Sequence, residues 1–249
     1  MKRFAVVQHT YSEFLGLIEN QLEKRDIGFH YFRPFVGQAL PGSAAQYDAL
    51  FLLGGRTPVT DRKANPWLDD ELNLIDTFRR AQRPVVGLGF GALLVAAHAG
   101  AHTSAEPFHR AYWTHAHKTA AGTGDALAEA VHGRRVLVMY NGTATLPAGV
   151  EPLLVDDDGQ WLAIRPDPLT YGLLFRPELK PGMIEDMIME AKRHTPDNIG
   201  ELLAQARAEW AHTQTLTDQV IVALVTELDL MTERRKMPVF NLQIAPDES

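Results

Sequence analysis

A strand that runs directly into a glycine-rich turn and then into an apolar helix constrains the fold of this chain most. Residues 84–91 read Pro-Val-Val-Gly-Leu-Gly-Phe-Gly, and residues 92–99 are almost entirely apolar. This pattern is typical of a nucleophile elbow, a tight turn that presents one side chain at the edge of an α/β sheet. The middle residue of the turn is Gly89, so the elbow is expected to present no side chain.

Apolar strands alternate with amphipathic helices along the first hundred residues. Strands are expected at residues 3–7, 29–32, 49–53 and 84–88, and helices at residues 13–25, 65–80 and 92–99. Ser12 is expected to cap the start of the first helix, and Gly28 lies where that helix is expected to end. Strands that are apolar throughout are usually buried on both faces. The order therefore predicts a three-layer α/β fold, with a mixed, mostly parallel sheet covered by helices on both faces.

The second half of the chain has a different pattern. Strands at residues 136–140, 151–155, 160–164 and 171–175 are expected to continue the sheet in antiparallel fashion, before a helix at residues 184–193. Two amphipathic helices are expected at residues 198–211 and 216–234, with a loose tail from Pro238. We divide the chain into an α/β domain, residues 1–193, and a C-terminal helical extension, residues 194–249. The apolar stripe Ile221, Leu224, Leu228 and Met231 is expected to lie in the core or at a dimer surface.

Composition excludes several classes of function. The formal net charge is -7 and no long basic run occurs, which argues against nucleic-acid binding. The absence of cysteine excludes disulfides, thiolate zinc sites and a cysteine nucleophile. The apolar run at residues 4–7 is too short for a signal peptide. Glycines and histidines interrupt the uncharged stretch at residues 84–105, so a membrane span is not expected there. These features predict a cytoplasmic protein that binds no membrane.

A histidine cluster around Trp113 is the only candidate metal site. His115 and His117 have a spacing that can ligate a metal from a strand, and His109 lies nearby. They have no clear carboxylate or cysteine companion, although Asp125 lies downstream. A solvated loop is the simpler interpretation of this segment, so we expect neither a metal nor a cofactor.

Four motifs resemble those of a known family in their order and spacing. They are Leu-Gly-Gly at residues 53–55, Asn-Pro-Trp-Leu at 65–68, the elbow at 87–91, and Tyr-Gly-Leu-Leu-Phe-Arg-Pro-Glu at 171–178. Together they resemble the oxyanion loop, a helix start, the G-x-C-x-G elbow and the final G-x-Q-F-H-P-E segment of class I glutamine amidotransferases. The resemblance covers about residues 4–192 and implies a flavodoxin-like α/β fold.

The resemblance also implies that the catalytic machinery is incomplete. In that family an elbow cysteine attacks the glutamine side-chain amide, and a His–Glu pair activates it. Here the cysteine position is Gly89, the histidine position is Arg176, and the glutamate position is retained as Glu178. The glutamine-binding Gln of the family is Leu93. Glycine has no nucleophile, and arginine remains protonated and cannot act as a base, so glutamine hydrolysis is not expected.

The remaining site residues leave alternatives open. Gly54, Gly55 and Phe90 are expected to offer backbone N–H groups to an anion, or to form only a relic turn. Arg176 and Glu178 either bind a carboxylate or phosphate ligand or form an ion pair that fills the former catalytic space. Asn-Gly at residues 141–142 is expected to form a turn.

Three hypotheses for function follow. The first is an amidotransferase-like protein without glutaminase activity, which binds a synthetase or other enzyme subunit, a small anionic ligand, or a second copy of itself. The second is an enzyme of different chemistry that uses Glu178 with Arg176 or with His115 and His117. The third is a structural component of an oligomer, with residues 198–234 as its interface.

Overall fold

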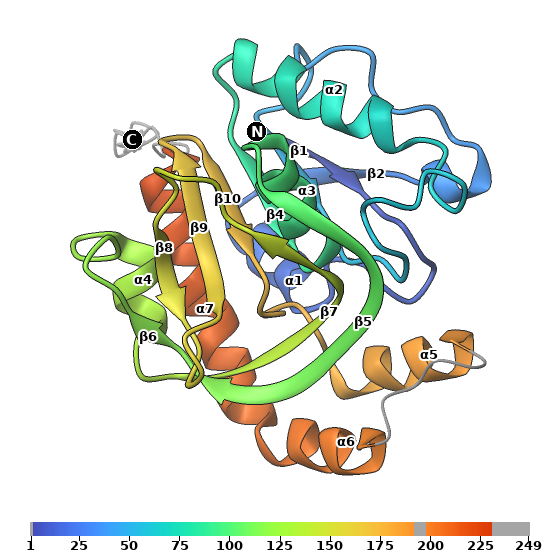
Figure 1. Ribbon diagram of the computed structural model, residues 1–249. Helices are drawn as coiled ribbons and strands as arrows, with labels where there is room; N and C mark the ends of the chain where they lie inside the picture. The colour runs from blue at the N-terminus through green and yellow to red at the C-terminus, as the bar shows by residue number, and fades with distance from the viewer. Residues whose placement is uncertain (1, 192–197, 231–249) are drawn as a thin grey trace, which may run out of the picture.

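The computed structural model describes residues 2–191 and 198–230, with the side chains of residues 105–109 and 191 excepted. The strands of its main sheet are β1 (Lys2–Val7), β2 (Ile27–Phe32), β3 (Ala49–Leu52), β4 (Val85–Leu88), β6 (His117–Lys118), β8 (Pro152–Val155), β9 (Trp161–Asp167) and β10 (Thr170–Leu173). Within the described residues they form one sheet, in the order β2-β1-β3-β4-β10-β9-β8-β6 (Figure 1).

The sheet is mixed, as expected from the sequence. Strands β2, β1, β3, β4 and β10 pair in parallel, whereas β9, β8 and β6 continue the sheet in antiparallel fashion. Strand β10 pairs with β4 in register, with Gly172 opposite Gly87, although β4 begins at Val85 and β10 begins at Thr170. The carboxyl ends of β1, β3 and β4 therefore lie at one edge, where α/β proteins usually place their sites.

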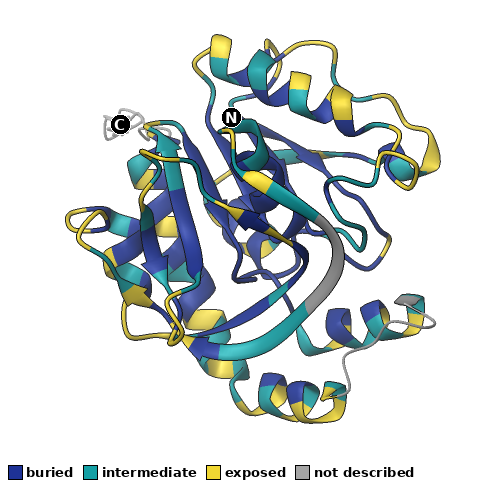
Figure 2. Cartoon of the chain, viewed as in Figure 1, coloured by how far each residue is buried: buried dark blue, intermediate teal, exposed yellow. Residues whose placement is uncertain are grey.

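Helices cover both faces of the sheet. They are α1 (Leu17–Glu23), α2 (Leu68–Arg80), α3 (Phe90–His98), α4 (Ala126–Val131), α5 (Pro181–Ala191), α6 (Ile199–Ala208) and α7 (Trp210–Glu227), and a 3-10 turn, η1, spans Pro34–Val36. Helix α7 contacts α1 and α4, while α2 contacts α3. Figure 2 shows the buried sheet between these layers. The predicted three-layer α/β fold is confirmed.

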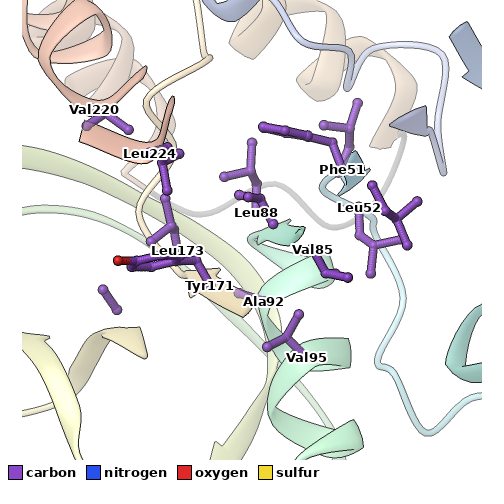
Figure 3. Close-up of a cluster of buried hydrophobic side chains, with 14 of the residues drawn as sticks. Phe51, Leu52, Val85, Leu88, Ala92, Val95, Tyr171, Leu173, Val220 and Leu224 are labelled. Atoms are coloured by element: carbon purple, nitrogen blue, oxygen red, sulfur yellow. The ribbon is translucent and has the colours of Figure 1, made fainter. Parts of the chain in front are cut away.

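Helix α7 is part of the main hydrophobic core. Val220 and Leu224 lie beside Tyr171 and Leu173 of β10 (Figure 3), and all four are at most 1% exposed. Ile221 and Leu228 are buried in the same cluster. The described part of the C-terminal stripe therefore lies in the core and not at a dimer surface. Met231 and the tail from Pro238 lie outside the described residues. The domain boundary at residue 193 stays a prediction.

A separate two-stranded sheet, which we call the β5–β7 sheet, corrects two sequence expectations. Strand β5 (His102–His115) pairs with β7 (Arg135–Thr145) in a separate antiparallel sheet. The segment with the three histidines is therefore largely strand rather than loop, and residues 136–140 do not extend the main sheet. Residues 141–142 lie inside β7 rather than in a turn, because β5 supplies a pairing partner along most of β7.

The β5–β7 sheet packs between two hydrophobic clusters. Val136 and Val138 belong to the main core, whereas Leu137 faces a second cluster with α5 and α6. Alternation of buried side chains along β7 explains how one strand serves both cores. In Figure 1 the β5–β7 sheet curves between the main body and helices α5 and α6.

The first helix begins later than expected. Gly16, the residue before α1, adopts a φ of 54°. A Cβ on it would lie 2.2 Å from the Glu178 carbonyl oxygen, so this position requires glycine. Ser12 consequently does not cap the helix and instead donates to Glu190. Gly28 lies in β2, and Asp26, with a φ of 56°, adopts the left-handed backbone between helix and strand.

In the described part of the chain, no helix has the length and apolarity needed to cross a membrane.

Candidate functional site

The expected elbow is present between β4 and α3. Gly89 is the residue before α3 and adopts a φ of 56°, a backbone region that favours glycine. Gly91 lies against β3, since a Cβ on it would lie 2.0 Å from the Leu52 carbonyl oxygen. These two glycines allow the helix to begin directly over the sheet. The turn places Gly89 at the carboxyl end of β4, without a side chain.

Arg176 occupies the space in front of this elbow. Its Nε donates to Glu178 Oε1 at 2.6 Å, and its Nη1 donates to Glu13 Oε1 at 3.0 Å and to the Met139 carbonyl at 3.1 Å. Arg176, Glu178 and Glu13 are 3%, 0% and 1% exposed. The arginine is thus held by groups from three separate parts of the chain. Of the two structural expectations for Arg176 and Glu178, the observed contacts are those of a buried ion pair.

A side chain on either Gly89 or Gly54 would meet Arg176. A Cβ on Gly89 would lie 3.1 Å from both Cδ and Nη1 of Arg176. A Cβ on Gly54 would lie 2.1 Å from Glu13 Oε1 and 2.3 Å from Arg176 Nη2. The guanidinium and the Glu13 carboxylate therefore fill the space between the oxyanion-loop position and the elbow.

The charges of this cluster do not balance one to one. Burial lowers the pKa of Arg176, but Glu178 and Glu13 more than compensate and raise it, so the guanidinium remains charged. Burial raises the pKa of the Glu178 carboxyl above its ordinary value, and Glu13 adds to this effect. Two carboxylates thus share one cation, and Glu178 Oε2 has no hydrogen-bond partner.

No motif in the sequence pointed to Glu13 as a site residue. It was expected in the first helix, but it precedes α1 because Gly16 interrupts the helical pattern. Thr10 Oγ1 donates to its Oε2 at 3.2 Å and accepts from its backbone N–H. Glu13 and Arg176 are 163 residues apart, and no spacing in the sequence relates them.

Side chains lie beside the residues that were expected to offer backbone N–H groups to an anion. The Gly54 carbonyl oxygen lies 2.9 Å from His9 Nδ1. A Cβ on Gly55 would lie 3.0 Å from Phe90 Cγ, so that ring covers the glycine. Leu93 is 0% exposed on α3 and offers only an apolar surface at the position of the family's glutamine-binding residue.

A second buried pair lies beside the elbow and was missed in the sequence. His9 Nε2 lies 2.8 Å from Glu71 Oε1, and the side chains are 3% and 0% exposed. The His9 ring packs on Phe90 with 4.7 Å between centroids. The signal that could have found it is its place, directly after the first buried strand, at the edge where β/α loops gather.

His115 at the end of β5 and His117 in β6 have a separate acidic partner. His117 Nε2 lies 2.6 Å from Asp157 Oδ1, and His115 Nδ1 lies 3.5 Å from Asp157 Oδ2. Asp125 has other partners: its side chain caps α4 and binds Arg165. No group of three or more potential metal ligands occurs among the described side chains, which do not include that of His109.

A further set of polar contacts joins segments that contribute to the site. Glu190 at the end of α5 accepts from Ser12 Oγ at 2.5 Å, and its carbonyl accepts from Arg56 Nη1 at 2.7 Å. Asn141 Nδ2 donates to the Arg56 carbonyl. Helix α5, the segment after β1, the loop after β3 and strand β7 are thereby joined.

The sheet order, the elbow and the segment that follows β10 define the fold of the glutamine amidotransferases. The structure superposes on a glutamine amidotransferase from Methylobacillus flagellatus with a TM-score of 0.77 and 20% identity, over 92% of this chain and 96% of that one. A glutamine amidotransferase from Thermotoga maritima gives a TM-score of 0.73 and 20% identity, over 90% and 98% of the two chains.

The sequence itself has a more limited similarity. It is 32% identical over 108 residues to the glutamine amidotransferase-like protein YfeJ of Salmonella typhimurium. That match covers 42% of this chain and 45% of YfeJ, which is less than half of either protein. No protein-family model matches the chain. The comparisons therefore establish the fold, with a related sequence over part of it.

Proposed function

We propose that this chain is a class I glutamine amidotransferase-like protein that does not hydrolyse glutamine and acts as a binding or regulatory subunit. The fold and the partial similarity to YfeJ support the family. Gly89 at the elbow, Arg176 at the position of the catalytic histidine, and the buried Leu93 support the loss of activity. Each replaces a group that the family's covalent mechanism requires.

One observation supports this proposal most strongly. The Arg176 guanidinium, 3% exposed, lies against both Gly54 and Gly89 and binds two carboxylates. A substrate amide bound at the elbow would need the same space. An intact elbow that faces the buried Arg176 side chain suits a protein that retains the fold for its surfaces.

The contacts of the cluster disfavour the other hypotheses for this site. Arg176 is 3% exposed and already bonded to Glu13 and Glu178, so an added anionic ligand would have to compete with these two carboxyl groups. Glu178 is 0% exposed and bonded to Arg176, which leaves it no access to a substrate. His115 and His117 bind Asp157 instead of the elbow. We therefore favour a protein partner, a synthetase or other enzyme subunit or a second copy, over a small anion. A cytoplasmic location stays a prediction from the sequence.

A glutaminase assay tests the loss of activity. Purified protein incubated with glutamine is expected to release no ammonia above the buffer rate, measured with a coupled glutamate dehydrogenase assay. An active amidotransferase assayed in parallel is the positive control. Release at ordinary enzyme rates, about 1 per second or more, would contradict the proposal.

A single replacement at the elbow tests the role of Arg176. Gly89→Cys restores a thiol, but we expect it to remain inactive because Arg176 still fills the adjacent space and no base is present. Reaction of that thiol with a maleimide probe in the unfolded and folded protein shows whether it is covered. Glutamine hydrolysis by this variant would show that another residue serves as the base.

A further inference from the structure

His9 and Glu71 form a buried pair directly behind the elbow. His9 comes from the segment after β1, Glu71 from α2, and the ring between them packs on Phe90 of α3. The other ring nitrogen, Nδ1, lies 2.9 Å from the carbonyl oxygen of Gly54 in the loop after β3. One imidazole thus joins the ends of two strands and two helices.

The hydrogen-bond partners fix how many protons the ring needs. A carbonyl oxygen only accepts, so Nδ1 must donate to Gly54. The Glu71 carboxylate also only accepts, so Nε2 must donate at 2.8 Å. A neutral imidazole has one N–H and one lone pair and cannot satisfy both acceptors. The observed geometry therefore fits an imidazolium that donates from both nitrogens.

We propose that the His9–Glu71 pair is a proton-dependent device that holds the loop after β3, residues 53–60, against α2 and the elbow. With both ring nitrogens protonated, the loop is fixed through the Gly54 carbonyl. When the proton leaves, the lone pair on one ring nitrogen faces an oxygen acceptor, and one of the two bonds is lost. The device acts whether or not the chain hydrolyses glutamine.

The surroundings favour the charged ring. Burial lowers the pKa of His9, but the charge and hydrogen bond of Glu71, the bond to the Gly54 carbonyl and the charge of Glu13 together raise it above 6.5. Arg176, bound to Glu13, is the cation on that side, and the Phe90 ring on α3 is uncharged.

The direction of the pH effect follows from this raised pKa. The proton is bound more tightly in the closed loop than in the open one, so stabilisation is complete below about pH 6.5. It is lost as the pH rises through the pKa of the closed state. Across that interval, opening of the loop is expected to increase by up to about tenfold per pH unit, the limit for one proton.

Hydrogen exchange measured by mass spectrometry tests the proposal on the full chain. Protection factors for peptides covering residues 53–60, which correct for base-catalysed exchange, are expected to fall between pH 6.5 and 9. In Glu71→Gln the amide group can donate to Nε2 while Nδ1–H still donates to Gly54, so a neutral ring satisfies both contacts. Protection in that variant is expected to be independent of pH.

Asp76→Asn is the matched control. His98 Nε2 lies 3.0 Å from Asp76 Oδ1 at the edge of the protein, so this variant removes a His–carboxylate contact away from the loop. Its protection factors are expected to follow those of the wild type. Constant protection in the wild type, or the same decline in Glu71→Gln, would overturn the proposal.

A measurement on the wild type alone keeps the proposal testable if Glu71→Gln does not fold. Nitrogen chemical shifts of labelled histidine distinguish an imidazolium from either neutral tautomer. His9 is expected to have both nitrogens protonated at pH 7 and to titrate above 6.5. A neutral ring for His9 at pH 7 would contradict the proposed device.

Discussion

A buried arginine is the residue that most distinguishes this site. Arg176 neutralises part of the charge of Glu13 and Glu178, and none of the three has access to water. Buried ion pairs contribute little net stability compared with apolar packing, but loss of one partner leaves a charge unpaired in a medium of low dielectric. The cluster is therefore expected to be sensitive to any change that removes the cation.

Arg176→Met is expected to lower the free energy of unfolding by about 3–5 kcal/mol, because two buried carboxylates lose their partner. Urea denaturation followed by circular dichroism measures the change. Arg62→Met is the matched control, since Arg62 pairs with Asp69 at the surface, and its effect is expected to be below about 1 kcal/mol. Equal stability of the two variants would contradict the inference that Glu13 and Glu178 depend on the Arg176 cation.

At the scale of elements, the elbow depends on the close approach of α3 to β3. Gly91→Ala would place a methyl group against the backbone at Leu52, so either the helix or the strand must shift. We expect a loss of about 1–3 kcal/mol in the free energy of unfolding, the usual cost of overpacking.

Gly182→Ala in α5 is the control for that variant, because a Cβ there meets nothing within 4 Å. It is expected to be neutral or to stabilise by up to about 1 kcal/mol, as alanine favours helix. Urea denaturation of both proteins measures the difference. A neutral effect of Gly91→Ala would show that α3 is not fixed by its contact with β3.

Strands β1, β3 and β4 could be predicted from their apolar runs. Strand β10 was expected in the antiparallel continuation, but it pairs in parallel with β4 because it inserts between β4 and β9. The β5–β7 sheet could not be predicted. Residues 102–115 contain charged and polar residues, and their pairing with β7 depends on two hydrophobic clusters that form from distant parts of the chain. Tertiary packing here overrides local pattern.

The candidate site was predictable in part for the same reason. Gly89, Arg176 and Glu178 could be placed because each lies in a motif with fixed local geometry. Glu13 and His9 could not, since their partners are Arg176 and Glu71, 163 and 62 positions away. A backbone turn can be recognised from neighbouring residues in the sequence, whereas an ion pair between distant segments cannot.

For the whole molecule, α7 belongs to the core rather than to a separate appendage. Leu224→Ala is expected to lower the free energy of unfolding by about 2–5 kcal/mol, since Leu224 is 1% exposed. Val222→Ala on the same helix is the control. Val222 is 46% exposed, and its replacement is expected to change stability by no more than about 0.5 kcal/mol.

Thermal and urea unfolding of the two α7 variants give the comparison. Size-exclusion chromatography of both variants separates a core role from an interface role. A changed oligomeric state in Val222→Ala, with little effect of Leu224→Ala on stability, would contradict the placement of this stripe in the core.

The insertion of β10 beside β4 has a consequence for biosynthesis. Residues 85–88 leave the ribosome long before residues 170–173, so one edge of β4 has no neighbour during much of translation. Unpaired strand edges are templates for aggregation. The face formed by Tyr171 and Leu173 stays uncovered until α7, Trp210–Glu227, has also emerged. The nascent chain therefore completes its native sheet only after β10 and α7 have both been made, and products truncated before α7 would expose both surfaces to other chains.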